Sequence, residues 1–545
     1  MGFNDLLESI GGVGYFHILH NILILIPVCM VSFHSYLQNF TAAVPNHHCR
    51  IRVDTNQACD ANLTDKEQLQ VYIPINKEGK SKKCHQFQVA QCHILNATVS
   101  NITDLDTEPC TDGWTYDQSQ FVSTIISEWD LVCNQQVLKQ VAQSIYMAGV
   151  LVGSGLFGWL SDRFGRRRML IWTHLQVAVA GTLVAFLPTF SCYCVFRFLS
   201  GMGTSGICII SLSLILEWIP TQGRTLAGNC YGYFAASGQM ILAGLAYGLR
   251  NWRWLQFAAC APFFLFFLYS WLLLESARWL ILKGKHDLAL RNLKIAAWVN
   301  GKKEEGEKIT IEMLKENIPM NSSKVSSYSF LDLFRTPGMR RISCCLMLVC
   351  FSTYFAFFAL ALDLTTFGFS IFLVQLIFGA IDIPGKLICT LTMGLFGRRI
   401  TQAVSLILSG LLIIGGIFVP KGVWSNLKHK GIPALHTTMA ILAKGCLSGA
   451  MACMLQFSGE LYPTVVRQRG LGLSFMSAYF GSMLAPAVYL LGDIVSFLPY
   501  LIYGVASMVA GVAACFLLET RQALLPDTIE EVENDVIPAS KLSQV

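Results

Sequence analysis

The stretch GWLSDRFGRRR, residues 158–168, places five charges in eleven residues. It directly follows a segment without any charge, SIYMAGVLVGSGLFG, residues 144–158. An uncharged segment that ends in a group of arginines is typical of a helix that emerges from a bilayer on the cytoplasmic side, because Lys and Arg in short loops stay there. The whole chain agrees, since 53% of its 545 residues are hydrophobic and 14% are charged, against roughly 25% charged residues in soluble proteins. Lipid is therefore the principal solvent of this chain.

Twelve segments of the chain are apolar over about the 20 residues that a helix needs to cross the hydrocarbon layer. The alternating pattern of a membrane β-barrel is missing, and an open sheet would leave its edges unpaired in lipid. We therefore predict an all-α polytopic membrane protein with twelve transmembrane helices. The predicted spans are 16–36, 138–160, 169–187, 193–216, 226–249, 255–274, 342–362, 370–393, 401–419, 435–458, 469–492 and 498–518.

Basic residues mark one side of this arrangement. The loops between spans two and three, eight and nine, and ten and eleven all contain arginines, which predicts that both termini are cytoplasmic. The net charge of +6 is then a property of these loops and does not indicate nucleic-acid binding. Residues 1–15 lack the basic start of a signal peptide. Their apolar residues Phe3, Leu6, Leu7 and Ile10 recur at helical spacing and predict a short cytoplasmic helix in the membrane interface.

The long polar segment 38–139 must then be extracellular. It contains six cysteines, an even number that predicts disulfides in an oxidising compartment without deciding how they pair. His47 and His48 beside Cys49 could offer zinc ligands, but we assign Cys49 to a disulfide and predict no metal site. The segment also contains sequons for N-glycosylation. The disulfide candidates are Cys49, Cys59, Cys84, Cys92, Cys110 and Cys133, and the glycosylation candidates are Asn62, Asn96 and Asn101, with Asn39 as a further sequon beside the membrane.

The chain repeats itself. The pattern E-x-x-P-T-x-x-R occurs at 217–224 after span four and again at 460–467 after span ten, and Gly-Arg-Arg occurs at 165–167 and at 397–399. Glu275, at the end of span six, has an echo in Glu519, at the end of span twelve. Three pairs in the same order predict two duplicated six-helix halves, the architecture of secondary transporters that bind substrate near the bilayer midplane.

The opening stretch is similar to the loop signature of the major facilitator superfamily, Gly-x-Leu-x-Asp-Arg-x-Gly-Arg-Arg. This resemblance implies that the arginines pair with Glu217 or Glu275 while the cytoplasmic side is closed and release them when it opens. The alternative is that they only fix the topology. The gating candidates are Asp162, Arg163, Arg166, Arg167, Glu217, Arg224, Glu275, Arg278, Arg398, Arg399, Glu460 and Arg467.

Longer stretches narrow the resemblance. LQNFTAAVPNHHCR (37–50), EPCTDGW (108–114), STIISEWDLVC (123–133), ESARWL (275–280), NGKKEEGE (300–307), GELYPTVVRQ (459–468) and LPDTIEEVEN (525–534) resemble the organic anion transporters of the solute carrier organic-ion family. The resemblance implies a monomeric plasma-membrane carrier of amphipathic organic anions, working by exchange. It divides the chain into an N-terminal helix (1–15), a first half (16–274), a cytoplasmic helical loop (275–341), a second half (342–518) and a cytoplasmic tail (519–545).

The resemblance also implies a central site. Lys386, in span eight, matches a lysine that the family places in its cavity, and the alternative role is an ion pair with Asp382 one turn earlier. Lys444 lies nearer the outer end of its span, where snorkelling or packing is the expected role. Aromatic residues on span seven form the apolar part of the predicted site. The substrate-binding candidates are Lys386, Tyr354, Phe357, Phe358, Tyr231, Gln239, His34, Ser35 and Tyr479.

Tyr479 is the main departure from the family. In the segment SFMSAYFGSMLAP the family's anion carriers have an arginine and its cation carriers favour an aspartate, whereas this chain has Tyr479. A bidentate partner for carboxylate or sulfate is therefore missing. We expect amphipathic monoanions, such as steroid sulfates, to be preferred over short dicarboxylates.

Two other functions stay open: an organic cation or zwitterion carrier, and a transporter-like sensor with little flux. An enzyme or an ATP-driven pump is disfavoured, because the sequence has no G-x-x-x-x-G-K-S/T loop and no metal-spaced His/Cys cluster, and no cofactor is expected. The last residues, Ser543-Gln544-Val545, fit the C-terminal pattern that PDZ domains bind. They predict a PDZ scaffold as a partner, beside the small organic anion and the lipid bilayer.

Overall fold

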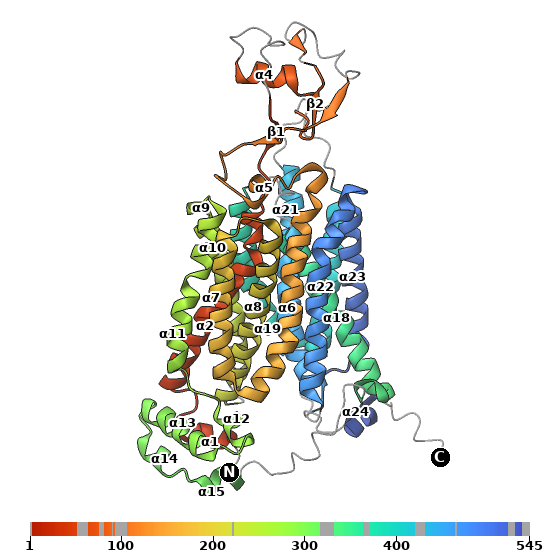
Figure 1. Ribbon diagram of the computed structural model, residues 1–545. Coiled ribbons are helices and arrows are strands. Elements are labelled where there is room, and N and C mark those ends of the chain that lie inside the picture. The colour runs from red at the N-terminus through yellow and green to blue at the C-terminus, as the bar shows by residue number, and fades with distance from the viewer. Residues whose placement is uncertain are drawn as a thin grey trace, which may run out of the picture. The chain divides into compact units, whose positions relative to one another are not determined.

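The computed structural model describes residues 3–51, 64–75, 81–89, 91–92, 106–220, 223–316, 332–362, 370–419, 431–463, 466–521 and 529–536. The chain forms two compact units (Figure 1). The first unit, Met1–Asn39 with Gln140–Gly248 and Gln256–Val545, contains most of the long helices. The second unit, Phe40–Lys139 with Leu249–Leu255, contains the cysteine-rich segment.

The first half of the chain supplies six spans. The sixth is broken into three short helical pieces, because Pro262 begins a new helix directly after Ala261. The spans are α2 (Tyr15–Tyr36), α6 (Val137–Phe164), α7 (Arg166–Phe186), α8 (Phe190–Trp218), α9 (Arg224–Gly248), and α10 (Trp252–Cys260) with α11 (Pro262–Tyr269) and the 3-10 turn Ser270–Leu272.

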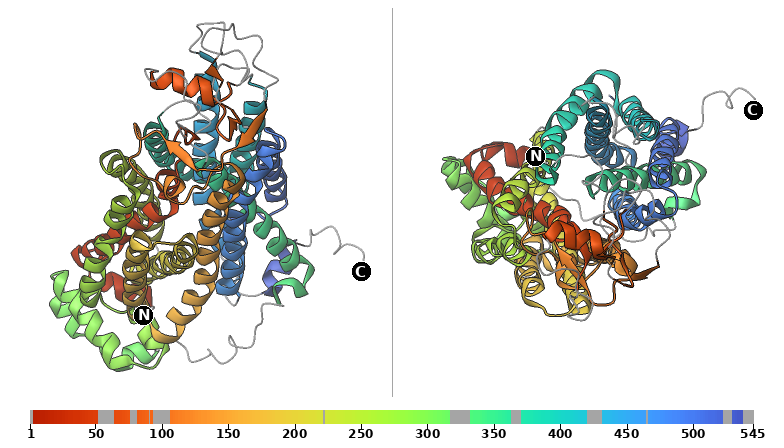
Figure 2. Two further views of the ribbon diagram at one scale, coloured as in Figure 1. Left: turned by 45° about the horizontal axis from the view of Figure 1, so that its top comes forward. Right: turned by 90° about the horizontal axis from the view of Figure 1, so that it is seen from above.

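The second half repeats this arrangement. Its spans are α18 (Pro337–Leu362), α19 (Ile371–Phe396), α20 (Arg398–Ile417), α21 (Gly431–Leu461), α22 (Arg467–Tyr489) and α23 (Leu498–Ala514). Within the described residues, ten helical stretches are long and apolar enough to cross a membrane. The remaining two predicted spans are α9, of 25 residues, and α23, of 17 residues. The prediction of an all-α polytopic fold is confirmed. Seen from above, the spans of the first half, red to green, group apart from those of the second half, cyan to blue (Figure 2).

Short helices follow the sixth span. α12 (Ala277–Leu282), α13 (His286–Val299), α14 (Lys303–Glu307) and α15 (Ile311–Glu316) form a small layer at the end of the first half, and α17 (Asp332–Arg335) and α24 (Ile529–Val536) lie at the end of the second half. The N-terminal α1 (Phe3–Ser9) belongs to the first layer (Figure 1).

The environment of α1 differs from the sequence prediction. Leu6, Leu7 and Ile10 are at most 1% exposed. They share one buried cluster with Leu293 of α13 and Leu314 of α15. The prediction that the apolar face of residues 1–15 lies in the membrane interface was therefore wrong. Apolar residues at helical spacing predict that one face of the helix is buried, but they do not predict whether lipid or protein covers that face.

The second unit is small and held by covalent bonds. β1 (His47–Cys49) pairs antiparallel with β4 (Trp114–Tyr116), and β2 (His85–Phe87) pairs with β3 (Thr107–Pro109). Two short helices, α4 (Asp65–Tyr72) and α5 (Ile125–Glu128), complete it. Disulfides join Cys49 to Cys110 and Cys84 to Cys133, and Cys92 is disulfide-bonded too. The predicted candidates Cys59, Asn62, Asn96 and Asn101 lie outside the described residues.

Contacts in the structure bear on the sequon at Asn39 and on the alternative of a zinc site at His47. Asn39 Nδ2 donates to Ala361 O (2.9 Å) and to Gln375 Oε1 (3.0 Å). This nitrogen is the atom that would carry a sugar, so glycosylation would remove these bonds. His47 does lie near Cys84 and Cys133, but those two sulfurs are already joined to each other.

Candidate functional site

The most deeply buried ion pair among the described residues lies inside the second half. Lys444 Nζ, on α21, donates to Asp382 Oδ1 (2.9 Å) and Oδ2 (3.0 Å), on α19. The two side chains are 0% and 4% exposed. The ammonium group also lies 3.6 Å from the ring centre of Phe357. Of the two roles expected for Lys444, snorkelling and packing, the structure has the packed one, because Asp382 holds the lysine inside the bundle.

Lys386 is one turn further along α19 than Asp382, and Asp382 does not neutralise its charge. Its Nζ donates to the carbonyl oxygen of Gly232 on α9 (2.8 Å). A Cβ atom at Gly232 would meet the Lys386 side chain at 3.2 Å, so a glycine gives the lysine room. Asp382 is already paired with Lys444. Among the described residues, no carboxylate lies within ion-pair distance of Lys386, and its hydrogen bond joins the two halves of the chain.

Aromatic rings gather on α18, the first span of the second half. Tyr354 lies edge-on to Tyr479 of α22, with ring centres 5.6 Å apart, and 6.1 Å from Phe358. Phe358 also stacks with Tyr36 of α2 at 6.4 Å and contacts Phe357 at 5.5 Å. Phe357 is the ring beneath the Lys444 ammonium. The three predicted aromatics on span seven and Tyr479 thus form one cluster, and the buried ion pair adjoins it.

The other predicted candidates lie differently. Tyr231 precedes Gly232 on α9, and its hydroxyl donates to Cys208 O at 3.4 Å. Gln239 is 0% exposed, two turns further along that helix. His34 is also 0% exposed, and its ring packs against Phe263 of α11 at 5.6 Å. It therefore points into the interior of the first half, whereas its neighbour Ser35 is half-buried.

Sequence reasoning overlooked a second buried cation. Arg197, on α8, is 0% exposed, and its guanidinium lies 4.4 Å from the ring centre of Tyr146. Its Nη2 donates to Gln38 Oε1 at 3.5 Å. The sequence contained a signal for this residue, because an arginine inside an apolar span is costly and usually has a function.

A first charged cluster, which we call the N-terminal charged cluster, surrounds the start of α7. Arg166 Nη2 is 2.9 Å from both Asp162 Oδ1 and Glu217 Oε1. Glu275 accepts from the backbone N–H groups of Arg166 (2.9 Å) and Arg167 (3.1 Å). Gly165, with φ +106°, permits this approach, since a Cβ there would meet Glu275 at 2.4 Å. Burial raises the pKa of the Glu275 carboxyl, although these backbone hydrogen bonds oppose the shift.

A second, C-terminal charged cluster repeats this geometry at the start of α20. Arg398 donates to Glu460 through Nε (3.1 Å) and Nη2 (3.1 Å). Glu519 accepts from the backbone N–H groups of Arg398 (2.9 Å) and Arg399 (3.1 Å). Gly397 has φ +93°, and a Cβ there would meet Glu519. The pairing between Arg398 and Glu460 supports the interpretation of the repeated motifs as duplicated halves.

The remaining gating candidates stand at the edges of these clusters. Arg163 lies 5.4 Å from the rings of Trp159 and Phe164, and Arg278 is exposed. Arg467 Nε donates to Tyr462 O at 3.1 Å. The side chain of Arg224 lies outside the described part of the chain.

The two halves meet by hydrogen bonds away from these clusters. Ser144 Oγ, in the first third of α6, donates to Met483 O of α22 at 3.2 Å. Asn39 binds both α18 and α19, as described above. In contrast, the ion pairs of each charged cluster join residues of a single half.

Comparison with known proteins agrees with this geometry. Residues 22–532 match the family described as "Sugar (and other) transporter". Solute carrier family 22 member 6-B of Xenopus laevis is 48% identical over 98% of this chain and 95% of its own length. The chain belongs to solute carrier family 22. A further relative, organic anion transporter 3 of Rattus norvegicus, is 44% identical over 98% of this chain and 95% of its own length.

Solved structures show the same fold at lower identity. The proton:xylose symporter XylE, of the major facilitator superfamily, matches with a TM-score of 0.60 at 16% identity, over 96% of this chain and 99% of its own. An inward-open conformation of XylE from E. coli matches with a TM-score of 0.59 at 15% identity, over 95% and 99%. The predicted superfamily fold is confirmed. The family and these neighbours are transporters and not enzymes.

Proposed function

We propose that this solute carrier family 22 member transports organic anions across the plasma membrane by alternating access, as an exchanger. The proposal rests on the positive charge of Lys386, which Asp382 does not neutralise. Asp382 neutralises Lys444, so Asp382, Lys386 and Lys444 together sum to one positive charge, at a contact between the two halves. A cation in that place attracts an anionic head group, and relatives named organic anion transporters support the choice of anions.

The aromatic cluster that adjoins the buried pair of Lys444 and Asp382 favours one kind of anion. The rings of Tyr354, Phe358 and Tyr479 offer an apolar surface, and burial of a hydrophobic body contributes about 25 cal/mol per Å². Tyr479 stands where an arginine would supply a second cation. A small dianion needs such a donor to offset its desolvation. We therefore infer a preference for bulky monoanions of the steroid-sulfate kind over short dicarboxylates.

The position of the contacts supports an alternating mechanism. Hydrogen bonds join the halves at Ser144 and Asn39, near the end of the bundle where α6 begins. At the opposite end, each charged cluster is closed within its own half. The halves also meet along α9 and α19, where Lys386 binds Gly232 O and Thr390 Oγ1 donates to Asn229 Oδ1 (3.5 Å). The arrangement fits a carrier in which each half moves as a rigid body and these contacts between halves form and break as the inner end opens and closes.

The proposed orientation places both termini in the cytoplasm and the disulfide-bonded second unit outside. Disulfides persist in oxidising surroundings, and the arginines of the charged clusters favour the cytoplasmic side. The C-terminal segment with Val545, proposed to bind a PDZ scaffold, lies outside the described residues. Removing Val545 should weaken capture by a PDZ domain and leave uptake unchanged.

The test of the proposal is uptake by cells that express surface-quantified variants. Lys386→Ala should reduce uptake of a labelled steroid sulfate strongly, while Lys386→Arg, which keeps the charge, should retain part of it. Lys302→Ala, on an exposed turn, is the matched control. Unchanged anion uptake by Lys386→Ala would contradict the proposal, and uptake of cations alone would favour the cation or zwitterion carrier. Binding without flux would favour a sensor.

A competition measurement tests the substrate class separately. A steroid sulfate should inhibit uptake more strongly than a five-carbon dicarboxylate does. Tyr479→Arg should narrow that difference by adding a second cation. Stronger inhibition by the dicarboxylate in the unmodified protein would show that the inference from Tyr479 is wrong.

A further inference from the structure

Helix α13 is tied to the ends of two membrane spans. Asn292 Nδ2, in its middle, donates to Glu275 O just after the sixth span (3.0 Å). At its end, Asn300 Oδ1 accepts from the backbone N–H of Phe16 at the start of α2 (2.8 Å), and Asn300 Nδ2 donates to Ile10 O (2.9 Å). These bonds hold α13 across the ends of spans one and six, at the level where the hydrocarbon layer gives way to head groups.

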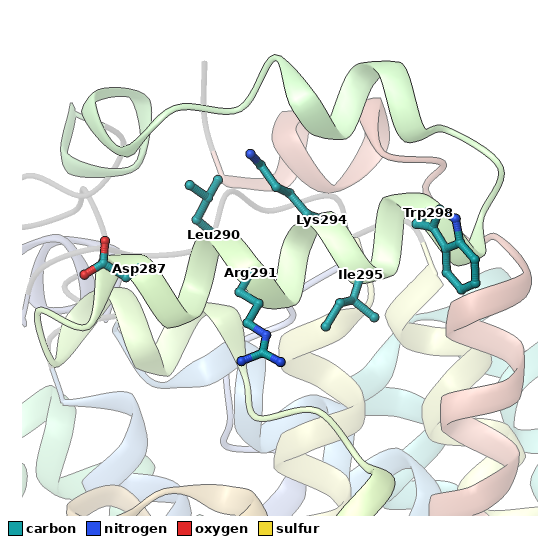
Figure 3. Close-up of a pocket in the computed structure, with 6 residues that line it drawn as sticks. All are labelled: Asp287, Leu290, Arg291, Lys294, Ile295 and Trp298. Carbon is teal, nitrogen blue, oxygen red and sulfur yellow. The ribbon is translucent and has the colours of Figure 1, made fainter.

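The two faces of α13 have different surroundings. Ala289, Leu293 and Ala296 are 0% exposed and pack in the cluster that also contains α1. The opposite face forms an open groove of about 440 Å³. It is lined by Asp287, Leu290, Arg291, Lys294, Ile295 and Trp298 (Figure 3).

The groove combines a basic and an apolar surface. Arg291, Ile295 and Trp298 point towards the membrane spans, and Lys294 points to the other side of the groove (Figure 3). Trp298 is 66% exposed, an unusual position for tryptophan in water. Lys283 and Lys285 directly precede the helix, so residues 283–298 contain four Lys or Arg side chains and one acid, Asp287. The glutamates of the neighbouring α14 flank Gly306, which packs on α13 near Lys294. Exposed tryptophan beside Lys and Arg at the level of span ends is the pattern of an interfacial anchor.

We propose that the groove on α13 binds the head group of an anionic phospholipid in the adjoining leaflet. Arg291, which points towards the spans, contacts the phosphate, Lys294 on the other side of α13 adds to the local positive charge, and Trp298 and Ile295 lie against the glycerol and upper acyl region. Charge complementarity selects an anionic lipid over a zwitterionic one. The bonds from Asn292 and Asn300 place the groove against the bilayer itself. The proposal goes beyond anion transport and rests only on the membrane-spanning fold.

The test uses the full-length protein in liposomes of phosphatidylcholine, with or without a fifth of phosphatidylserine in both leaflets. Phosphatidylserine should raise the melting temperature of the unmodified protein and co-purify with it. The double variant Arg291→Gln, Lys294→Gln should bind this lipid on the order of tenfold more weakly. The control Lys302→Gln, Lys303→Gln removes the same charge from the exposed start of α14 and should behave as the unmodified protein.

Several outcomes would overturn the proposal. They are an equal lipid response in the double variant, no response in the unmodified protein, or the same response to soluble inorganic phosphate, which would indicate a free-anion site. Trp298→Ala gives a second check if the double variant aggregates, and it should weaken lipid retention without removing its charge selectivity. Lys386→Ala should lose anion uptake and keep the lipid response, so failure of the transport proposal is distinguishable from failure of this one.

Discussion

The two charged clusters are copies of one another in sequence, but the first is more tightly built than the second. In the N-terminal charged cluster, Arg166 is 12% exposed and pairs with two carboxylates. In the C-terminal charged cluster, Arg398 is 25% exposed and pairs with Glu460 alone. The offset that relates Arg166 to Arg398 places Gly394 where the first half has Asp162.

The features that the two charged clusters share and the features that differ between them have separate physical roles. Both copies keep a glutamate on two backbone N–H groups at a helix start, Glu275 in one and Glu519 in the other. Such a carboxylate satisfies donors that a helix leaves unpaired and offsets its dipole. The second carboxylate occurs in the first copy only, where Trp279 Nε1 also donates to Asp162 O (2.9 Å). We infer that the first half contributes more to control of the inner end.

The largest effect should come from removing each central arginine. Arg166→Ala should lower surface-corrected uptake about tenfold, and Arg398→Ala about threefold, because the first leaves the half-buried Glu217 and the exposed Asp162 unpaired, whereas the second leaves Glu460 alone. Hydrogen bonds to charged groups contribute about 1.5–3 kcal/mol, and 1.4 kcal/mol is a factor of ten. Binding of substrate should change less than turnover. Equal losses of uptake in the two variants would contradict the inferred difference between the two clusters. Equal loss of substrate binding and of turnover would indicate that these arginines only set the topology.

An intermediate effect should appear in the pH dependence of stability. Burial raises the pKa of Glu275, so the folded protein binds this proton more strongly than the unfolded chain, and the stability from this group decreases as pH rises through the folded pKa. Glu275→Gln removes that term. As the pH rises above the ordinary glutamate pKa of about 4.3, the unmodified protein should therefore lose more thermal stability than the Glu275→Gln variant. Glu519→Gln serves as the matched substitution in the other copy, and identical pH profiles for Glu275→Gln and the unmodified protein would contradict the assignment.

The smallest effect tests the missing carboxylate itself. A Cβ atom at Gly394 meets nothing within 4 Å, so Gly394→Asp can place an acid one turn before Arg398. An exposed pair of this kind contributes about 0.5 kcal/mol. Gly394→Ala isolates the change in helix propensity, and Asp162→Asn should lose a similar amount in the first half. A melting temperature no higher for Gly394→Asp than for Gly394→Ala would show that the second cluster does not use an added carboxylate.

Several features of the site could be predicted from single residues, and others could not. The aromatic positions Tyr354, Phe357 and Phe358 follow from helical spacing, because residues three and four apart share a face. The ion-pair partner of Asp382 could not be predicted from the sequence. Lys386 is near it in sequence, but the helix packing brings Lys444, 62 residues away, into contact. His34 turns towards Phe263 for the same reason, since a sequence gives the face of a helix and not the neighbour that covers it.

The sequence by itself determined the spans, the duplication and the charged clusters, because apolar length, a repeated motif and glycine before arginine are local properties of the chain. Only the tertiary structure decided which cysteines pair, which lysine is neutralised, and that α1 packs on protein instead of lipid. It also tied α13, which carries Arg291 and Trp298, to the ends of spans one and six through the bonds of Asn292 and Asn300. Each of these outcomes depends on the distance between groups far apart in the chain. That distance is set by how the helices pack against one another.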